Sequence, residues 1–217
     1  MVQKNITYEK CPKIGTVLYV AINNKFEGYI LIADKIKDDS KNAINDLKKL
    51  NVKNTIMLTG DRKEVGEAVA KELKLDEVYT ELLPDGKVER LEELMKKKTE
   101  KGKVICVGDG INDAPVLALS DIGIAMGGLG SDAAIEAADI VIMTDEVSKI
   151  SKAIKISRKT MKIVKQNIIF AITVKILVLI LSAVGIATMW EAVFADVGVS
   201  ILAIINSLRM LQVKNFK

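Results

Sequence analysis

The sequence predicts an α/β domain with a parallel sheet, followed by a transmembrane helical hairpin. Short apolar runs alternate with helical patterns from Thr55 to Met143, and this alternation is typical of βαβ units. Two apolar segments follow, Ile168–Met189 and about Ala192–Leu208, and the first is long enough to cross a bilayer as a helix. Lysine and arginine flank the pair on both outer ends. We therefore expect a soluble unit joined to a membrane hairpin.

The composition narrows the chemistry that is open to the chain. Its 217 residues have a formal net charge of +4, and Lys and Glu are interspersed, so nothing indicates nucleic-acid binding. Histidine is absent, which removes the commonest soft-metal ligand and general base. Cys11 and Cys106 lack the spacing of a disulfide framework or a zinc site. Cys106 falls inside an apolar strand and is expected to be a core residue.

The most informative stretch starts with a short apolar strand and ends with two carboxylates. The continuous apolar run Val104–Val107 predicts a strand buried on both faces of a parallel sheet. Gly108-Asp109-Gly110 then permits a tight turn and leaves the Asp109 carboxylate at the carboxyl edge of the strand. Asp113 follows before Ala114-Pro115, which opens a helix. Open α/β sheets bind ligands at this edge, and Mg²⁺ commonly takes one or two carboxylates and a phosphate there.

A single Asp-Gly pair would favour a structural role, because Asp is common in turns and helix caps. The whole string from Gly108 to Pro115, Gly-Asp-Gly-Ile-Asn-Asp-Ala-Pro, resembles the hinge motif of P-type ATPases. These cation pumps are built on a haloacid-dehalogenase-like, Rossmann-like phosphorylation domain. The resemblance runs from Thr16 to Leu211. It implies Mg²⁺ as cofactor and ATP as substrate of the intact pump.

Two upstream segments strengthen this resemblance. Thr59-Gly60-Asp61 stands between a strand and a helix, and in isolation it would be interpreted as a helix cap. Its place ahead of Gly108 matches the P-type pattern in order and spacing. Pro84 and Lys87 match the Pro-x-x-Lys context in which the family has an essential lysine, and an ammonium is suited to neutralising a phosphate. In isolation Lys87 would be a solvated helix residue.

The resemblance implies a role for each of these residues in an intact pump. Asp109 would coordinate Mg²⁺ directly, while Asn112 and Asp113 would position the metal or the phosphoryl group. Phosphoryl oxygens or the nucleotide would be bound by Thr59, Gly60, Asp61 and Lys87.

Each apolar segment contains one interior charge, Lys175 in the first and Asp196 in the second. Charges inside a bilayer are costly and tend to mark an ion path. Counting the helical rise from the two interfaces brings them within reach of each other, so we expect an ion pair that a cation would displace. Lys175 and Asp196-Val-Gly198 resemble the zinc/cadmium/lead branch of the heavy-metal pumps. That implies Asp196 as ligand of the exported Zn²⁺, Cd²⁺ or Pb²⁺, with Lys175 as its counter-charge.

The pattern divides the chain into five parts. We expect the end of a nucleotide-binding domain with a connecting hairpin (1–33), the second part of a phosphorylation domain (34–146), a basic linker helix (147–166), two transmembrane helices (167–212) and a cytoplasmic tail (213–217). Basic flanks on both outer ends favour a multi-pass protein of the cell membrane with both termini in the cytoplasm. A buried core hairpin is the alternative, disfavoured by the length and the flanks.

Several family motifs do not occur in this sequence: the Asp-Lys-Thr-Gly-Thr phosphorylation motif, His-Pro, Thr-Gly-Glu and the intramembrane Cys-Pro-Cys. Cys11-Pro12 lies among charged residues and is rejected as a transport ligand. Since the family has these motifs upstream, we expect a C-terminal portion that needs the missing N-terminal part of the pump and forms no phosphoenzyme alone.

Two other classes stay open. A membrane-anchored phosphatase of the dehalogenase type would need an Asp-x-Asp nucleophile after an early strand, and Asp38-Asp39 has the wrong spacing. A truncated, non-catalytic membrane subunit or metal-binding regulator, derived from a pump and acting on an intact one, would be supported by co-purification with a full-length pump and by metal binding that requires Asp196.

Overall fold

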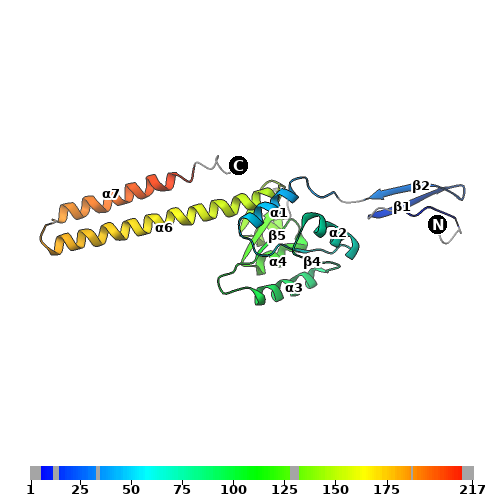
Figure 1. Cartoon of the computed structure of the whole chain (residues 1–217), viewed down its shortest axis with the longest axis horizontal. Helices are drawn as coiled ribbons and strands as arrows, with labels where there is room; N and C mark the ends of the chain where they lie inside the picture. Colours follow the sequence, from blue (N-terminus) through cyan, green and yellow to red (C-terminus); the bar gives the residue numbers. More distant parts are fainter. Residues whose placement is uncertain (1–5, 12–14, 33–34, 128–131, 187, 212–217) are drawn as a thin grey trace. The chain divides into compact units, whose positions relative to one another are not determined.

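The structure is a computed structural model that describes residues 6–11, 15–32, 35–127, 132–186 and 188–211. The chain divides into two compact units, Met1–Lys149 and Ile150–Lys217, and the boundary falls inside one long helix. Figure 1 shows strands and short helices in the first unit and two long helices in the second. The sequence also predicts a loop at residues 127–130 and a helix cap at Ser131, and all of these residues except Gly127 lie outside the described ones.

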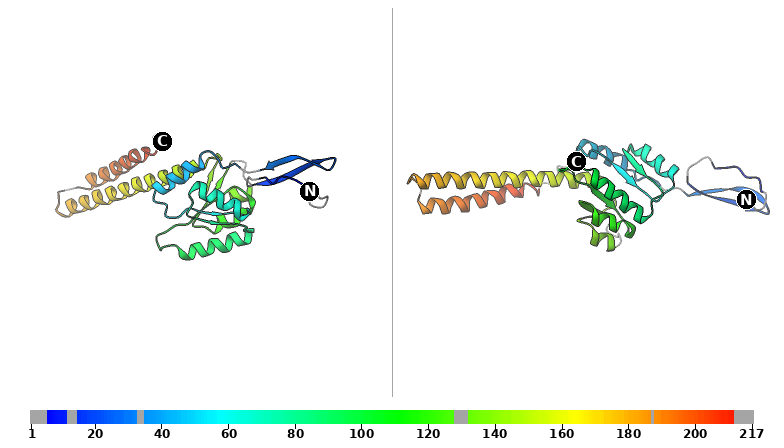
Figure 2. Two further views of the ribbon diagram at one scale, coloured as in Figure 1. Left: turned by 45° about the vertical axis from the view of Figure 1, so that its right-hand side comes forward. Right: turned by 90° about the horizontal axis from the view of Figure 1, so that it is seen from below.

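The predicted β-hairpin near the N-terminus is present. Strands β1 (Thr16–Ile22) and β2 (Lys25–Ile32) pair antiparallel with Ile22 opposite Lys25. Asn23 and Asn24 connect them with φ of 51° and 61°, the positive values that a two-residue type I′ turn requires and that Asn tolerates. The hairpin is the blue ribbon of Figure 2.

The predicted parallel strands form two sheets rather than one within the described residues. Strands β3 (Ile56–Leu58) and β4 (Glu77–Tyr79) make the first. Strands β5 (Ile105–Gly108), β6 (Ile122–Met126) and β7 (Ile140–Ile142) make the second, in the order β5-β6-β7. All of these pairs are parallel, as expected. Strand β5 is therefore an edge strand, and β3 has β4 as its one described neighbour.

Burial of β5 differs from the prediction. One face packs well: Cys106 contacts a cluster formed by Ala125 of β6, Leu117 of helix α4 (Ala114–Leu119) and Ala134 of helix α5 (Asp132–Ala137). On the other face, Ile105 and Val107 are 37% and 43% exposed, so burial on both faces is wrong for this chain. Cys106 is the core residue expected, and burial raises the pKa of its thiol.

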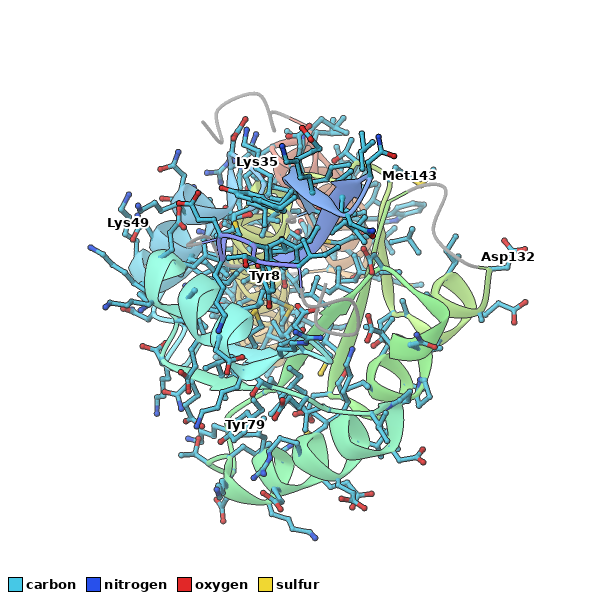
Figure 3. The ribbon with its side chains drawn as sticks, turned by 90° about the vertical axis from the view of Figure 1, so that its right-hand side faces the viewer. Tyr8, Lys35, Lys49, Tyr79, Asp132 and Met143 are labelled. Carbon is cyan, nitrogen blue, oxygen red and sulfur yellow. The ribbon has the colours of Figure 1, made fainter. Side chains whose placement is uncertain are left out.

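Three further helices belong to the first unit: α1 (Ser40–Lys49), α2 (Lys63–Leu73) and α3 (Pro84–Lys97). Helix α1 packs on α2, α2 on β4, and α3 on α4. The Arg90 guanidinium of α3 lies 4.3 Å from the centre of the Tyr79 ring at the end of β4. Figure 3 shows Tyr79 on the α3 side of the unit. This contact and the buried Leu91 hold α3 in place.

Two carboxylates fix the ends of strands. Asp121 accepts hydrogen bonds from Lys98, from Lys103 and from the Val104 backbone N–H at 2.9 Å, just before β5. These donors, Lys98 first, hold the pKa of Asp121 well below its ordinary value. Asp76 likewise accepts from the side chain and backbone of Thr55 ahead of β3, which lowers its pKa.

The membrane hairpin consists of α6 (Ser148–Ala183, 36 residues) and α7 (Met189–Leu208, 20 residues). Both are long and apolar enough to cross a membrane. The basic stretch expected as a linker helix is continuous with the first span, because no residue in it breaks the helix. The first span ends at Ala183 rather than Met189, since Gly185 follows with φ of 75°. The second starts at Met189, before the expected Ala192, because Thr188 and Glu191 form a capping box.

Candidate phosphoryl and metal sites

The first candidate site contains an ion pair between Lys87, at the start of α3, and Asp113, just before α4. Lys87 lies in the first turn of α3, which Pro84 opens, and Asp113 ends the 3-10 turn Ile111–Asp113 that joins β5 to α4. The Lys87 Nζ donates to Asp113 Oδ1 at 2.8 Å, and the two side chains are 18% and 24% exposed. A charge-assisted hydrogen bond of this kind is short and strong, so the pair is fixed before any ligand arrives.

Gly108 is required at this site because a side chain there would collide with Asp113, and not because the turn needs a positive φ. A Cβ atom there would lie 2.6 Å from Asp113 Cβ, a distance that forces something to move. Neither Gly108 nor Gly110 is among the glycines with positive φ, and a Cβ on Gly110 would meet nothing within 4 Å. The turn freedom expected of both glycines is therefore unused, and Gly108 instead lets the Asp113 side chain approach the strand end.

Asp109 follows the end of β5 directly, and its side chain is exposed, as is that of Asn112. Asp109 and Asp113 offer two carboxylates on the loop that leaves β5 at its carboxyl end, a number that suits Mg²⁺ when water and phosphate complete the shell. Within the described ranges, no group of three His, Cys, Asp or Glu side chains is gathered as a metal site. The residues thus fit an ion that is shared with a phosphate rather than one enclosed by protein alone.

The Thr59–Asp61 loop is held against the segment that leads into α3. The Thr59 hydroxyl donates to Asp61 Oδ2 at 2.8 Å, and the Leu82 N–H donates to the Thr59 carbonyl at 3.0 Å. A Cβ on Gly60 would lie 3.2 Å from the Leu82 carbonyl, so the loop runs close to this segment. The loop after β3 and the beginning of α3, with Lys87, are therefore tied together.

A cleft of about 660 Å³ lies beside this loop. Its lining includes Asp61 and Arg62 together with Lys35 and Lys41, but none of Lys87, Asp109 or Asp113. The Lys87–Asp113 pair and Asp109 thus do not line this cleft.

The second candidate site lies on the membrane hairpin. Lys175 of α6 and Asp196 of α7 end 4.0 Å apart, Nζ to Oδ1. Their side chains are 75% and 78% exposed on the surface of the hairpin. The structure thus brings together the two charges that the sequence predicts to be within reach of each other, on an exposed face of the hairpin.

Sequence reasoning missed two polar residues of the hairpin, Asn167 and Asn206. The Asn206 side chain donates to the Asn167 side chain across the two helices at 2.7 Å. The sequence signal that could have found them is an asparagine at each segment's end: Asn167 at the start of the first apolar segment and Asn206 near the end of the second. Such side chains need partners in a bilayer.

Comparisons with known proteins agree with this architecture. The family model of haloacid dehalogenase-like hydrolases matches residues 3–121. A cadmium, zinc and cobalt-transporting ATPase of Bacillus subtilis (strain 168) is 59% identical over 93% of this chain and 29% of its own length. A zinc-transporting ATPase of Synechocystis sp. is 52% identical over 96% of this chain and 29% of its own length.

Solved structures lead to the same class. The crystal structure of a zinc-transporting PIB-type ATPase in the E2.Pi state matches with a TM-score of 0.81 and 37% identity, over 90% of this chain and 31% of that one. The catalytic domain of the CPx-ATPase CopB-B matches with a TM-score of 0.51 and 33% identity, over 63% of this chain and 52% of that one.

The chain therefore belongs to the haloacid dehalogenase-like hydrolase family. Its resemblance to heavy-metal-transporting P-type ATPases of the zinc and cadmium branch is confirmed, as are the dehalogenase-like fold and the two membrane-type helices. The chain spans under a third of the length of these curated relatives.

Proposed function

We propose that this chain is part of an ATP-driven exporter of Zn²⁺ or Cd²⁺, to which it contributes phosphoryl-site residues and an intramembrane metal ligand. The single observation that supports this most is that each of the two candidate sites contains a Lys–Asp pair. Lys87–Asp113 lies beside the carboxyl end of a parallel strand, and Lys175–Asp196 lies on a membrane hairpin. The relatives that match more than nine-tenths of the chain are metal-transporting ATPases. The proposal extends to Pb²⁺ as a third cargo.

In the phosphoryl site, the chain's own residues position a phosphoryl group and neutralise its charge. The Lys87 ammonium, already held by Asp113, keeps further N–H donors for phosphoryl oxygens. The Gly60 N–H would be a further donor, and the Thr59 hydroxyl would become one by exchanging its hydrogen bond to Asp61 for one to a phosphoryl oxygen. Loose phosphoryl-transfer transition states need this positioning above all.

The same site has the residues to hold Mg²⁺. Asp109 would bind the ion directly, and Asn112 and Asp113 would orient it or the phosphoryl group. When bound, Mg²⁺ would neutralise developing charge on phosphoryl oxygens. ATP is the proposed phosphoryl donor of the whole pump.

The remaining partner is the rest of the pump. In the part of the chain that the structure describes, the outer edge of β5 has no partner strand, and Ile105 and Val107 are exposed. A further segment would satisfy backbone groups and cover apolar surface there. We propose that the N-terminal part of the pump supplies this cover and the phosphorylated aspartate. On this proposal the chain alone forms no phosphoenzyme from ATP, and stable phosphate incorporation by the purified chain would refute it.

In the membrane, Asp196 would bind the exported metal and Lys175 would balance its charge between transport cycles. Both helices cross the bilayer in this proposal, with both termini in the cytoplasm, because the basic residues of α6 precede the span and Arg209 follows α7.

The test is zinc uptake into inside-out vesicles by a pump that contains this chain. Asp196→Ala is expected to abolish Zn²⁺-dependent uptake and leave phosphorylation by inorganic phosphate intact, since the phosphoryl site lies in the other unit. Asp113→Ala is expected to abolish both. Asp132→Ala, at the exposed beginning of α5, is the matched control. Full uptake by the Asp196→Ala pump would refute the assignment.

The second candidate is a non-catalytic, metal-binding regulator of a complete pump, for which the Lys175–Asp196 pair on the membrane hairpin is the relevant feature. An immunoblot of the source membranes with an antibody against residues 152–165 separates the two. One band much larger than 23.7 kDa supports a complete pump, and a band at 23.7 kDa supports the regulator.

A further inference from the structure

A cluster of amide hydrogen bonds joins α6 to α7. The Asn167 Nδ2 donates to the Ala203 carbonyl at 3.2 Å and to Ser207 Oγ at 3.1 Å. The Asn206 Nδ2 donates to Asn167 Oδ1 at 2.7 Å, and Arg209 donates to Asn206 Oδ1 at 2.9 Å. Both carboxamides therefore donate and accept. We call Asn167 and Asn206 with these bonds the amide clamp.

The apolar surface between the two helices is nearly uniform and specifies their register weakly. The half-buried residues that repeat along α6 are Asn167, Ala171, Val174, Val178 and Leu181. Along α7 the half-buried positions are mostly small and include Ala192, Ala195, Gly198, Val199, Ala203 and Asn206. Small residues allow close approach but present similar contacts after a slip of one turn. Polar groups are what distinguish one register from another in such a seam.

The amide clamp and the Lys175–Asp196 pair lie in one antiparallel register. Lys175 is eight residues beyond Asn167, about 12 Å along the helix, and Asp196 is ten residues before Asn206, about 15 Å. The bonds of the clamp therefore predict that positions 175 and 196 face each other, as they do at 4.0 Å. A slip of one turn would displace Asp196 by about 5.4 Å and separate the charges.

We propose that Asn167 and Asn206 are positioning residues that set the register in which Lys175 faces Asp196. The register itself follows from the hairpin alone. Only the consequence for the exported metal rests on the proposed function: loss of the clamp would leave Asp196 with its carboxylate but without its counter-charge in place.

The test is site-directed cross-linking in the full 217-residue chain, in lipid nanodiscs and with Cys11 and Cys106 replaced by Ser. Lys175→Cys is combined in turn with Val193→Cys, Asp196→Cys or Ser200→Cys, which sample one turn on either side of the pair. A short thiol-to-thiol linker reports which positions face each other. Because Lys175→Cys removes the ion pair in all three variants, the amide clamp remains to set the register.

We expect the 175–196 product to dominate in the parent. With Asn167→Leu its yield relative to the 193 and 200 products should fall about threefold to tenfold, the range expected for losing interhelical hydrogen bonds in a membrane. Asn206→Leu should give the same fall, and the double variant little more, because both residues take part in one set of bonds.

The matched control is Thr173→Val, because the Thr173 hydroxyl donates to the Ile169 carbonyl of its own helix at 2.8 Å. A parent-like product ratio in Asn167→Leu, with helical content unchanged by circular dichroism, would overturn the proposal. So would an equal fall in Thr173→Val. If Asn167→Leu does not insert, Ser207→Ala removes one bond of the clamp and should give a smaller fall in the same direction, and no fall would overturn the proposal.

The measurement uses neither ATP nor metal, so it is independent of the transport assay. A pump whose zinc uptake survives Asp196→Ala would contradict the proposed function and leave the register result standing. A parent-like cross-linking ratio in the Asn167 and Asn206 variants would contradict the register proposal and leave the proposed function standing.

Discussion

Two lysine–aspartate pairs in this chain differ in almost every physical respect. Lys87 and Asp113 lie 2.8 Å apart with about a fifth of each side chain exposed. Lys175 and Asp196 lie 4.0 Å apart with three quarters exposed. The first pair is held by packing on both sides, from Gly108 and from the first turn of α3. The second depends on helix register and on an environment that the hairpin leaves open. The chain thus contains one Lys–Asp pair whose surroundings are already packed, Lys87–Asp113, and one whose side chains are largely exposed, Lys175–Asp196.

The largest effect is expected at the mostly buried pair, Lys87–Asp113. Lys87→Met should lower the phosphoryl-transfer rate of an intact pump by about 10²–10³-fold, because it removes a preorganised cation from the phosphoryl site. Phosphoenzyme formation from labelled ATP measures it. Lys63→Met is the control, since Lys63 makes only an exposed contact with Glu67 at 3.8 Å. Equal rates in the Lys87→Met and parent pumps would remove Lys87 from the mechanism.

The space that Gly108 leaves for Asp113 gives the next prediction. Gly108→Ala should destabilise the chain by about 1–3 kcal/mol, because the added methyl group meets Asp113 Cβ at 2.6 Å. Gly110→Ala, two residues away, has open space around its Cβ and should cost far less. Urea unfolding followed by circular dichroism compares the two. Similar losses for both would show that turn conformation, and not the approach of Asp113, governs this segment.

Acid should weaken the sheet through Asp121. Its pKa is lower in the folded than in the unfolded chain, so its stabilising contribution is complete above about pH 4 and is lost as pH falls toward the folded value. Asp121→Asn should be less stable than the parent at neutral pH, and the difference should shrink on acidification. Urea midpoints between pH 7 and pH 3 measure this. A difference that stays constant with pH would mean that the charge of Asp121 is not what fixes β5.

The smallest effect is expected at the open pair. In detergent solution, Lys175→Met should change the unfolding free energy of the hairpin by no more than about 0.5 kcal/mol, as for other exposed ion pairs. Thermal unfolding of α-helical signal is the measurement. A loss as large as that of Gly108→Ala would show that the pair stabilises the hairpin and is not merely presented by it.

Much of this protein followed from its sequence because the patterns are local. The Asn-Asn turn, the alternation of strands and helices and the lengths of the apolar segments depend on residues close together in the chain. Helix α2 follows Thr59-Gly60-Asp61, where the sequence predicts a helix. The placement of Lys175 opposite Asp196 also needed only helical rise and two interfaces, and the structure places them in contact range.

Tertiary structure alone decided which surfaces are covered and which groups meet. The run Val104–Val107 looks equally apolar on both faces, yet α4 and α5 cover one face and leave Ile105 and Val107 exposed. Gly108 serves an approach by Asp113 that no spacing rule reveals. Asn167 becomes informative only when α7 lies beside it. Sequence periodicity states which residues share a face, whereas burial and hydrogen-bond partners depend on segments distant in the chain.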